Sequence, residues 1–144
     1  MSAALVTAQM LLIAALAWPT GVPSLEGRTA FGTILVVLAI ALAFWALAAM
    51  RMPTFSVMPE PVAGGRLCRR GPYARLRHPM YSSVLLGGVG ALLVWPVGWK
   101  FVAFVVLALV LVAKIRREER LLRDAYPDYD DYRRQTRAVI PGLL

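Results

Sequence analysis

The stretch from Ala30 to Met50 contains no charged side chain, and it constrains the fold more than any other feature of the sequence. A helix of about 20 apolar residues, rising about 1.5 Å per residue, crosses the hydrocarbon core of a bilayer. The stretch therefore predicts a transmembrane helix. Composition agrees, because the 144 residues are 59% hydrophobic and have a mean hydropathy of +0.63, which exceeds the apolar share usual for soluble domains.

Three other uncharged apolar runs predict further helices, although each is shorter than a full span. They extend over Ala3 to Trp18, Pro79 to Trp95 and Phe101 to Ala113. Tryptophans and lysines stand at their ends, where we expect interfacial anchoring and snorkelling to make up the missing length; these residues are Trp18, Trp95, Trp99, Lys100 and Lys114. The expected fold is an all-α integral membrane bundle of about four transmembrane helices with a cytoplasmic C-terminal helical segment.

The first run has an alternative interpretation as a cleaved signal peptide. Ala15-Leu16-Ala17 resembles a small-residue cleavage site, but no lysine or arginine precedes the apolar run. We therefore expect a retained helix.

Basic residues concentrate in two segments, one between the second and third apolar runs and one after the fourth. The positive-inside rule places both segments, and with them both termini, in the cytoplasm of a multi-pass inner-membrane protein. A net charge of +8 could also indicate a nucleic-acid partner, but the arginines flank membrane spans and no nucleic-acid motif is visible. Topology and attraction to anionic lipid headgroups account for most of them. With one cysteine, Cys68, and one histidine, His78, we expect no disulfide and no metal site.

Proline and glycine divide the chain. Pro53 ends the second helix and begins a loop that reaches Gly65, and Gly71-Pro72-Tyr73 predicts a turn. Pro79 suits the first position of the third helix, with His78 near its N-cap.

The turn around Pro96 joins the last two apolar runs in a tight helical hairpin. Beyond Ala113 the helix is expected to continue as KIRREERLLRDAY and to stop near Pro127. A short helix carrying Tyr129 and Tyr132 should follow.

Three groups of residues could carry chemistry, and each has a simpler interpretation. His78 and Arg77, with the free N–H groups of a helix start, form an anion site, or else a helix cap and a lipid-phosphate contact. Glu118 and Glu119 follow Lys114 by about one turn, and they form part of a site or else a solvated helix end. Gly87 to Gly90 lie within the third helix and permit close helix packing or close approach of a ligand.

The order of these residues resembles a known family. GPYARLRHPMY, with RLC shortly before it, resembles the "L-V-x-x-G-P-Y-x-x-x-R-H-P-x-Y" core of integral-membrane methyltransferases. EERLLRDAYPDYDDY resembles their "E-E-x-x-L-x-x-x-F-G-x-x-Y-x-x-Y", and Ile140-Pro141 closes the pattern. The family includes isoprenylcysteine carboxyl methyltransferases and phospholipid N-methyltransferases. The interpretation is one domain over residues 1–144, with two transmembrane helices in 1–50 and a catalytic core in 64–144.

The resemblance implies S-adenosylmethionine as the methyl donor. By position it implies a cofactor site made by Leu67, Cys68, Tyr73, His78, Pro79, Met80, Tyr81, Gly88, Gly90, Glu118 and Glu119, with Glu118, Lys114 and Arg77 as catalytic residues. By their charges, Arg77 and the N–H groups of the third helix suit the donor carboxylate, while the two glutamates suit its ammonium or its ribose. Lys114 stands where the family often has arginine, which loses bidentate carboxylate recognition.

The implied function is methyl transfer to a lipophilic acceptor at the cytoplasmic membrane face, most like isoprenylcysteine carboxyl O-methylation. A phospholipid amine or a small-molecule thiol is the alternative acceptor. From another class, the chain could be a non-catalytic membrane scaffold or transport subunit. The expected partners are the lipid bilayer and the acceptor, without nucleic acid or metal.

Overall fold

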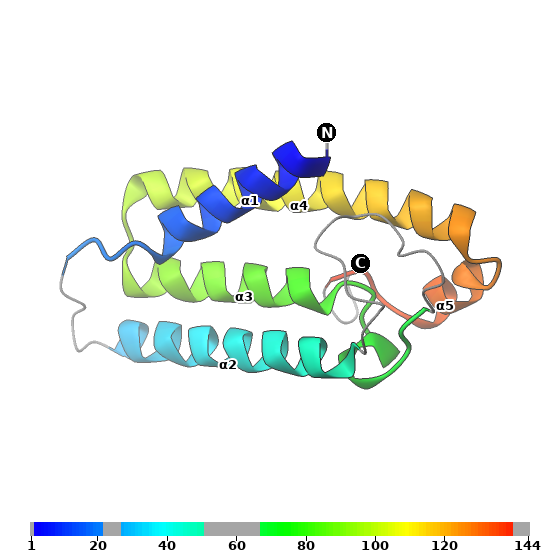
Figure 1. The fold of residues 1–144 in the computed structure, drawn as a ribbon. Coiled ribbons are helices and arrows are strands. Elements are labelled where there is room, and N and C mark those ends of the chain that lie inside the picture. Colours follow the sequence, from blue (N-terminus) through cyan, green and yellow to red (C-terminus); the bar gives the residue numbers. More distant parts are fainter. Residues whose placement is uncertain (1, 22–26, 51–66, 140–144) are drawn as a thin grey trace.

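The computed structural model describes residues 2–21, 27–50 and 67–139, and these form a helical bundle (Figure 1). The elements in chain order are α1 (Ser2–Ala17), α2 (Gly27–Ala49), the 3-10 turn η1 (Gly71–Ala74), α3 (Pro79–Val94), α4 (Gly98–Ala125) and α5 (Tyr129–Gln135). The described residues contain no β-strand, which confirms the predicted all-α class. The loop predicted from Pro53 to Gly65 and the closing Ile140-Pro141 lie outside the described residues.

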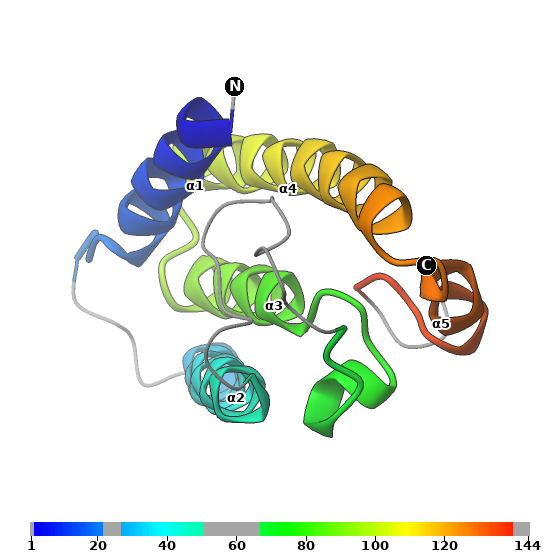
Figure 2. The ribbon, with the colours of Figure 1, turned by 45° about the vertical axis from the view of Figure 1, so that its right-hand side comes forward.

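The helices form two antiparallel pairs. α2 lies along α3 and α1 lies along α4, and the second pair covers one side of α3 (Figures 1 and 2). Glycine permits the closest contact, between α2 and α3. A Cβ added at Gly90 would lie 2.7 Å from the carbonyl oxygen of Gly32, and one added at Gly32 would lie 2.8 Å from that of Gly90. These glycines therefore let the two backbones touch.

The outward faces of the bundle are strongly apolar. Its core is small, made of Leu16, Leu92, Leu107 and Leu111, whereas many large apolar side chains lie exposed; these include Leu11, Phe31, Val37, Phe44, Trp45, Val102 and Leu109. A soluble protein would not leave so much hydrocarbon in water. α2 and α4 are long and apolar enough to cross a membrane, and α1 and α3 are shorter apolar helices. The fold is a helical membrane bundle, as predicted.

The two lysines expected to snorkel lie inside the bundle instead, so that expectation is wrong. Lys100 is 0% exposed, and its Nζ donates to the carbonyl oxygens of Leu16 (3.1 Å) and Trp18 (2.7 Å). These oxygens belong to the C-terminal end of α1, where a cation stabilises the unpaired carbonyls. Lys114 is 2% exposed and binds Gln9 on α1. Both lysines therefore fasten α1 to α4.

The polar end of the bundle is the end where α2 stops, α3 begins and α4 leaves its apolar stretch at Ala113. The predicted continuation of α4 is confirmed, as is the short helix that follows Pro127. Residues after α5 return to the start of α3, where Arg77 N donates to Arg137 O (2.7 Å) and His78 N to Ala138 O (3.0 Å). This return places the two halves of the sequence pattern side by side.

Candidate functional site

A cavity of about 310 Å³ opens at the polar end, within the range of small-molecule sites. Four helices and the 3-10 turn contribute to it, and its lining includes Gln9, Met10, Leu47, Met50, Tyr73, Arg77, His78, Met80, Tyr81, Val84, Lys114 and Glu118. The two sequence motifs meet here because α3 begins and α4 ends its apolar stretch at the same level. Charged side chains of both signs therefore face one small volume.

Glu118 supplies the negative charge of the cavity. Tyr81 OH donates to its Oε2 at 3.0 Å, and His78 Nδ1 lies 3.5 Å from the same oxygen. The His78 ring stacks on Tyr81 with a centroid separation of 5.4 Å. His78 is the N-cap residue of α3, but its side chain makes no capping hydrogen bond. His78 therefore stands at the N-cap position, as predicted, but its side chain does not cap the helix.

Lys114 supplies a positive charge one turn before Glu118. Its Nζ donates to Gln9 Oε1 at 2.6 Å and lies 5.2 Å from the centre of the Tyr81 ring. Because an ammonium has three donors, it retains donors for a ligand beyond the Gln9 bond. Lys114 and Glu118 thus present opposite charges to one cavity.

Arg77 makes more hydrogen bonds within the protein than we expect of a side chain that binds the carboxylate of a ligand. Its Nε donates to Glu119 Oε1 at 2.7 Å, and its Nη1 donates to the carbonyl oxygens of Arg133 (3.1 Å) and Thr136 (2.6 Å). The start of α3 is similarly occupied, since the N–H groups of Tyr81 and Ser82 both donate to His78 O. The donors expected to hold a carboxylate are therefore largely paired within the protein.

Tyr73 brings a buried hydroxyl to the cavity. Burial raises the pKa of this phenol, so it stays protonated, and it has no hydrogen-bond partner among the described residues. Tyr132 OH fixes the backbone of Tyr73 by donating to its carbonyl oxygen at 2.7 Å. A buried donor without a partner is costly, and a polar ligand in the cavity would satisfy it.

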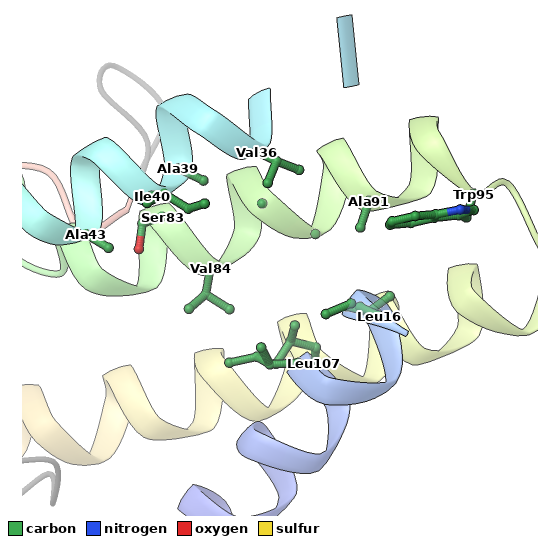
Figure 3. A pocket seen from close by; sticks show the side chains of 14 residues that line it. Leu16, Val36, Ala39, Ile40, Ala43, Ser83, Val84, Ala91, Trp95 and Leu107 are labelled. Atoms are coloured by element: carbon green, nitrogen blue, oxygen red, sulfur yellow. The ribbon is translucent and has the colours of Figure 1, made fainter. Parts of the chain in front are cut away.

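Several predicted site residues lie elsewhere. Leu67 and Cys68 are half-buried beside the end of α2, where Cys68 Sγ lies 3.5 Å from Ala49 O. Gly88 and Gly90 lie deeper in the bundle, and a Cβ at Gly88 would lie 2.7 Å from the Phe104 ring. Among the described residues that line the cavity, none of these four appears, nor do Pro79 and Glu119. Gly90 lies in a helix contact, as the simpler interpretation expected, whereas Gly88 lies in a helix contact and also lines an apolar cavity deeper in the bundle (Figure 3).

Sequence reasoning missed the contribution of the first two helices. Gln9 and Met10 of α1 and Leu47 and Met50 of α2 line the cavity. Gln9 carried a signal, because it has a long polar side chain in the middle of a largely apolar helix, and such residues usually mark a site or a buried partner. Met10, Leu47 and Met50 belong to apolar runs, and nothing in the sequence distinguishes them from their apolar neighbours.

The Arg77 and Glu119 pair predicts a pH dependence of stability. Burial of Glu119 would raise its pKa, but the nearby His78 ring, whose Nε2 lies 3.5 Å from Oε1, and the hydrogen bond from Arg77 outweigh burial and lower the pKa to about 2 from an ordinary 4.5. Glu119 lies beyond the apolar part of α4. A lowered carboxyl pKa stabilises the folded state fully above about pH 4.5, and that contribution is lost as the pH falls toward 2.

We expect the free energy of unfolding to fall by about 3 kcal/mol through this window from Glu119 alone. Denaturant titrations at a series of pH values measure it. Glu119→Gln should flatten the curve between about pH 4.5 and pH 2. An equally steep loss in that variant would assign the acid sensitivity to other carboxyls.

The structure is an apolar helical bundle whose cavity, at one end, is lined by charged side chains of both signs. These features define a membrane protein with a polar ligand site at the end of its apolar part. The chain matches the phospholipid methyltransferase family over residues 27–129 and belongs to that family. The match includes α2 and the whole of the cavity except the part that α1 contributes. The suspected membership of a membrane methyltransferase family is thereby confirmed.

Two curated proteins are similar to part of the chain. The cobalt-zinc-cadmium resistance protein CzcN of Cupriavidus metallidurans is 39% identical over 79 residues, which cover 54% of this chain and 36% of that protein. The nickel-cobalt-cadmium resistance protein NccN of Alcaligenes xylosoxydans xylosoxydans is 37% identical over 79 residues, covering 54% and 37%. The chain thus matches little more than a third of the length of these relatives. No solved structure matches it significantly.

Proposed function

We propose that this protein transfers a methyl group from S-adenosylmethionine to a lipophilic acceptor at the cytoplasmic membrane face. The observation that carries the proposal is the position of Lys114 and Glu118, with opposite charges, in a cavity where the methyltransferase sequence motifs meet. S-adenosylmethionine supplies an electrophilic methyl group on a sulfonium and also carries an ammonium and a carboxylate. Opposite protein charges complement such a molecule.

The cavity residues fit these groups. The Glu118 carboxylate complements positive charge on the donor, and the Tyr81 hydroxyl bonded to it fixes its direction. The remaining Lys114 donors and the unpartnered Tyr73 hydroxyl suit a carboxylate. Arg77 suits the donor carboxylate less well than the sequence indicates, because Glu119 and backbone carbonyl oxygens engage most of its donors.

The chemical step depends on the positioning of donor and acceptor more than on acid–base catalysis. As an acceptor oxygen forms its new bond to the methyl carbon, the carbon–sulfur bond breaks, its electron pair stays on sulfur and no proton moves. Orientation of bound reactants can contribute on the order of 7 to 11 kcal/mol to such a step. The protein's part is to align the acceptor and to exclude water.

A lipophilic carboxylate, as in isoprenylcysteine carboxyl methylation, is the acceptor we favour. It needs no general base, because a carboxylate is already deprotonated at neutral pH. The family description supports a phospholipid amine as the second candidate, for which Glu118 is the base within reach of the cavity. The metal-resistance names belong to the two relatives, and the described residues hold no cluster of three or more His, Cys, Asp or Glu suited to a metal ion.

Calorimetry of the purified protein with S-adenosylmethionine tests the proposal. We expect one site with micromolar affinity, and expect methyl-labelled donor added to membranes to label a lipid-extractable product. A base-labile label indicates a carboxyl ester, whereas label in phospholipid headgroups indicates an amine acceptor. Absence of donor binding would overturn the proposal and favour a non-catalytic scaffold or transport subunit.

A further inference from the structure

Gln9 brings a buried amide from α1 into the charged cavity. Its side chain is 6% exposed and lines the cavity together with Lys114 and Glu118 of α4. The family match begins at residue 27, so the methyltransferase sequence pattern does not account for Gln9. Burying an amide in a largely apolar helix costs free energy unless its polar atoms find partners. Lys114 satisfies only one of these atoms.

The bond to Lys114 fixes the orientation of the Gln9 amide. Lys114 Nζ lies 2.6 Å from Oε1. Because an ammonium donates hydrogen bonds but cannot accept them, the atom that faces it must be the amide oxygen. The Nε2 group, with two N–H donors, therefore lies on the other side of the amide carbon. It donates to no other group among the residues that the structure describes.

Gln9 and Lys114 thus present neighbouring donors to one part of the cavity. The Lys114 ammonium retains donors beyond its bond to Gln9, and Nε2 adds two uncharged donors beside that positive charge. An ionised carboxylate has two oxygens and no donor. The ammonium can bind one oxygen while the amide binds the other, and the charge on the ammonium strengthens the first bond. The ligand group that fits these two side chains is a carboxylate.

The position of Glu118 identifies the kind of carboxylate. Glu118 follows Lys114 by four residues, about 6 Å along α4, and Tyr81 OH fixes its carboxylate by donating to Oε2 at 3.0 Å. In a free α-amino acid the ammonium and the carboxylate are attached to one carbon atom. Such a group can bind Glu118 through its ammonium while its carboxylate binds Lys114 and Gln9.

We propose that Gln9 is a specificity-determining residue that binds the carboxylate of the methyl donor through Nε2, beside Lys114. The inference rests on the proposed function, since it takes the charged cavity as the donor site. It assigns to α1 a direct part in donor recognition. The amide selects a donor with an intact amino-acid group over one that lacks the carboxylate.

Nuclear magnetic resonance of the full-length protein in detergent tests the contact directly. Glutamine occurs only at positions 9 and 135 of the sequence, so labelling glutamine with ¹⁵N at Nε2 gives two side-chain amide signals, which Gln9→Met assigns. S-adenosylmethionine should shift a Gln9 amide proton downfield. Decarboxylated S-adenosylmethionine, which keeps the sulfonium and the ammonium, should not do so. Gln135, exposed on α5, is the internal control.

Calorimetry with the same two ligands tests the energetic role of Gln9. Gln9→Met should weaken binding of S-adenosylmethionine by about 10- to 100-fold and that of the decarboxylated ligand by less than about threefold. Gln9→Glu, which keeps an acceptor for Lys114 but offers the ligand no amide donor, should weaken S-adenosylmethionine at least as much. Thr7→Val changes an exposed polar residue of α1 and should leave both affinities unchanged.

The outcomes separate a ligand contact from a structural role. A Gln9 amide signal that stays unmoved while calorimetry detects S-adenosylmethionine binding, or that moves equally with both ligands, would overturn the inference and leave the proposed function standing. Equal losses for the two ligands in Gln9→Met would likewise reduce Gln9 to a structural partner of Lys114. If the unmodified protein binds no S-adenosylmethionine, the proposed function fails and the inference fails with it.

Discussion

Changing Glu118 to glutamine should weaken binding of S-adenosylmethionine by about 10- to 100-fold, the cost of losing a hydrogen bond or contact to a charged group. The amide keeps the size of the side chain and can still accept from Tyr81 OH, which lies 3.0 Å from Oε2. What it loses is the negative charge opposite Lys114 in the cavity. Methyl transfer at limiting donor should fall at least as much, and calorimetry with initial rates measures both.

Asp124→Asn is the matched control for Glu118→Gln. It removes one carboxylate from the same helix, at an exposed position nearer the end of α4. We expect it to leave donor affinity and thermal unfolding unchanged. Glu118→Asp, which keeps the charge on a shorter side chain, should fall between the unmodified protein and glutamine. Donor affinity in Glu118→Gln equal to that of the unmodified protein would remove Glu118 from the site.

Helix positions could be predicted from the sequence because local properties decide them. The uncharged run before Met50 was sufficient for α2, and proline defined the start of α3 at Pro79 and the stop before α5. The continuation of α4 past Ala113 followed from the absence of any breaker before Pro127. Each of these signals lies within one turn or one apolar run.

Side-chain partners were less predictable because they depend on helix packing. Lys100 was expected to snorkel toward water, but the carbonyl oxygens at the end of α1 hold its side chain inside the bundle. Gln9 is 105 residues from Lys114 in the chain, and only the packing of α1 on α4 brings them together. A sequence motif can show that a charge is needed without showing which partner it binds.

Arg77 illustrates the same difficulty within the motif itself. Its place beside His78 and Pro79 suggested a ligand for the donor carboxylate. The return of the chain after α5 instead brings the carbonyl oxygens of Arg133 and Thr136 to its guanidinium. Only the pairing of residues 76–78 with 137–138 reveals this, and no local signal in either segment predicted it.

Changing Arg77 to alanine should therefore reduce the free energy of unfolding by about 3 to 5 kcal/mol, the usual cost of breaking a buried ion pair. The guanidinium and the Glu119 carboxylate are both largely buried, and their contact is 2.7 Å. Alanine leaves this carboxylate and two carbonyl oxygens without their donor. Denaturation in mixed micelles measures the loss, and Arg70→Ala, an exposed arginine of the same loop, should change stability by less than about 0.5 kcal/mol.

The double variant Arg77→Ala, Glu119→Gln distinguishes a structural role of Arg77 from a role as a ligand of the methyl donor. If the structural role dominates, removing the unpaired Glu119 carboxylate restores part of the lost stability. The double-mutant cycle then gives a coupling energy between Arg77 and Glu119 of about 1 to 3 kcal/mol. Arg77→Lys should recover little of the lost free energy of unfolding. One ammonium cannot bond to Glu119, Arg133 and Thr136 together, as the guanidinium does. An Arg77→Ala protein with full stability but no affinity for S-adenosylmethionine would reverse the assignment, making Arg77 a ligand of the donor. Since Arg77 also lines the charged cavity, stability and donor affinity must be measured on the same preparations.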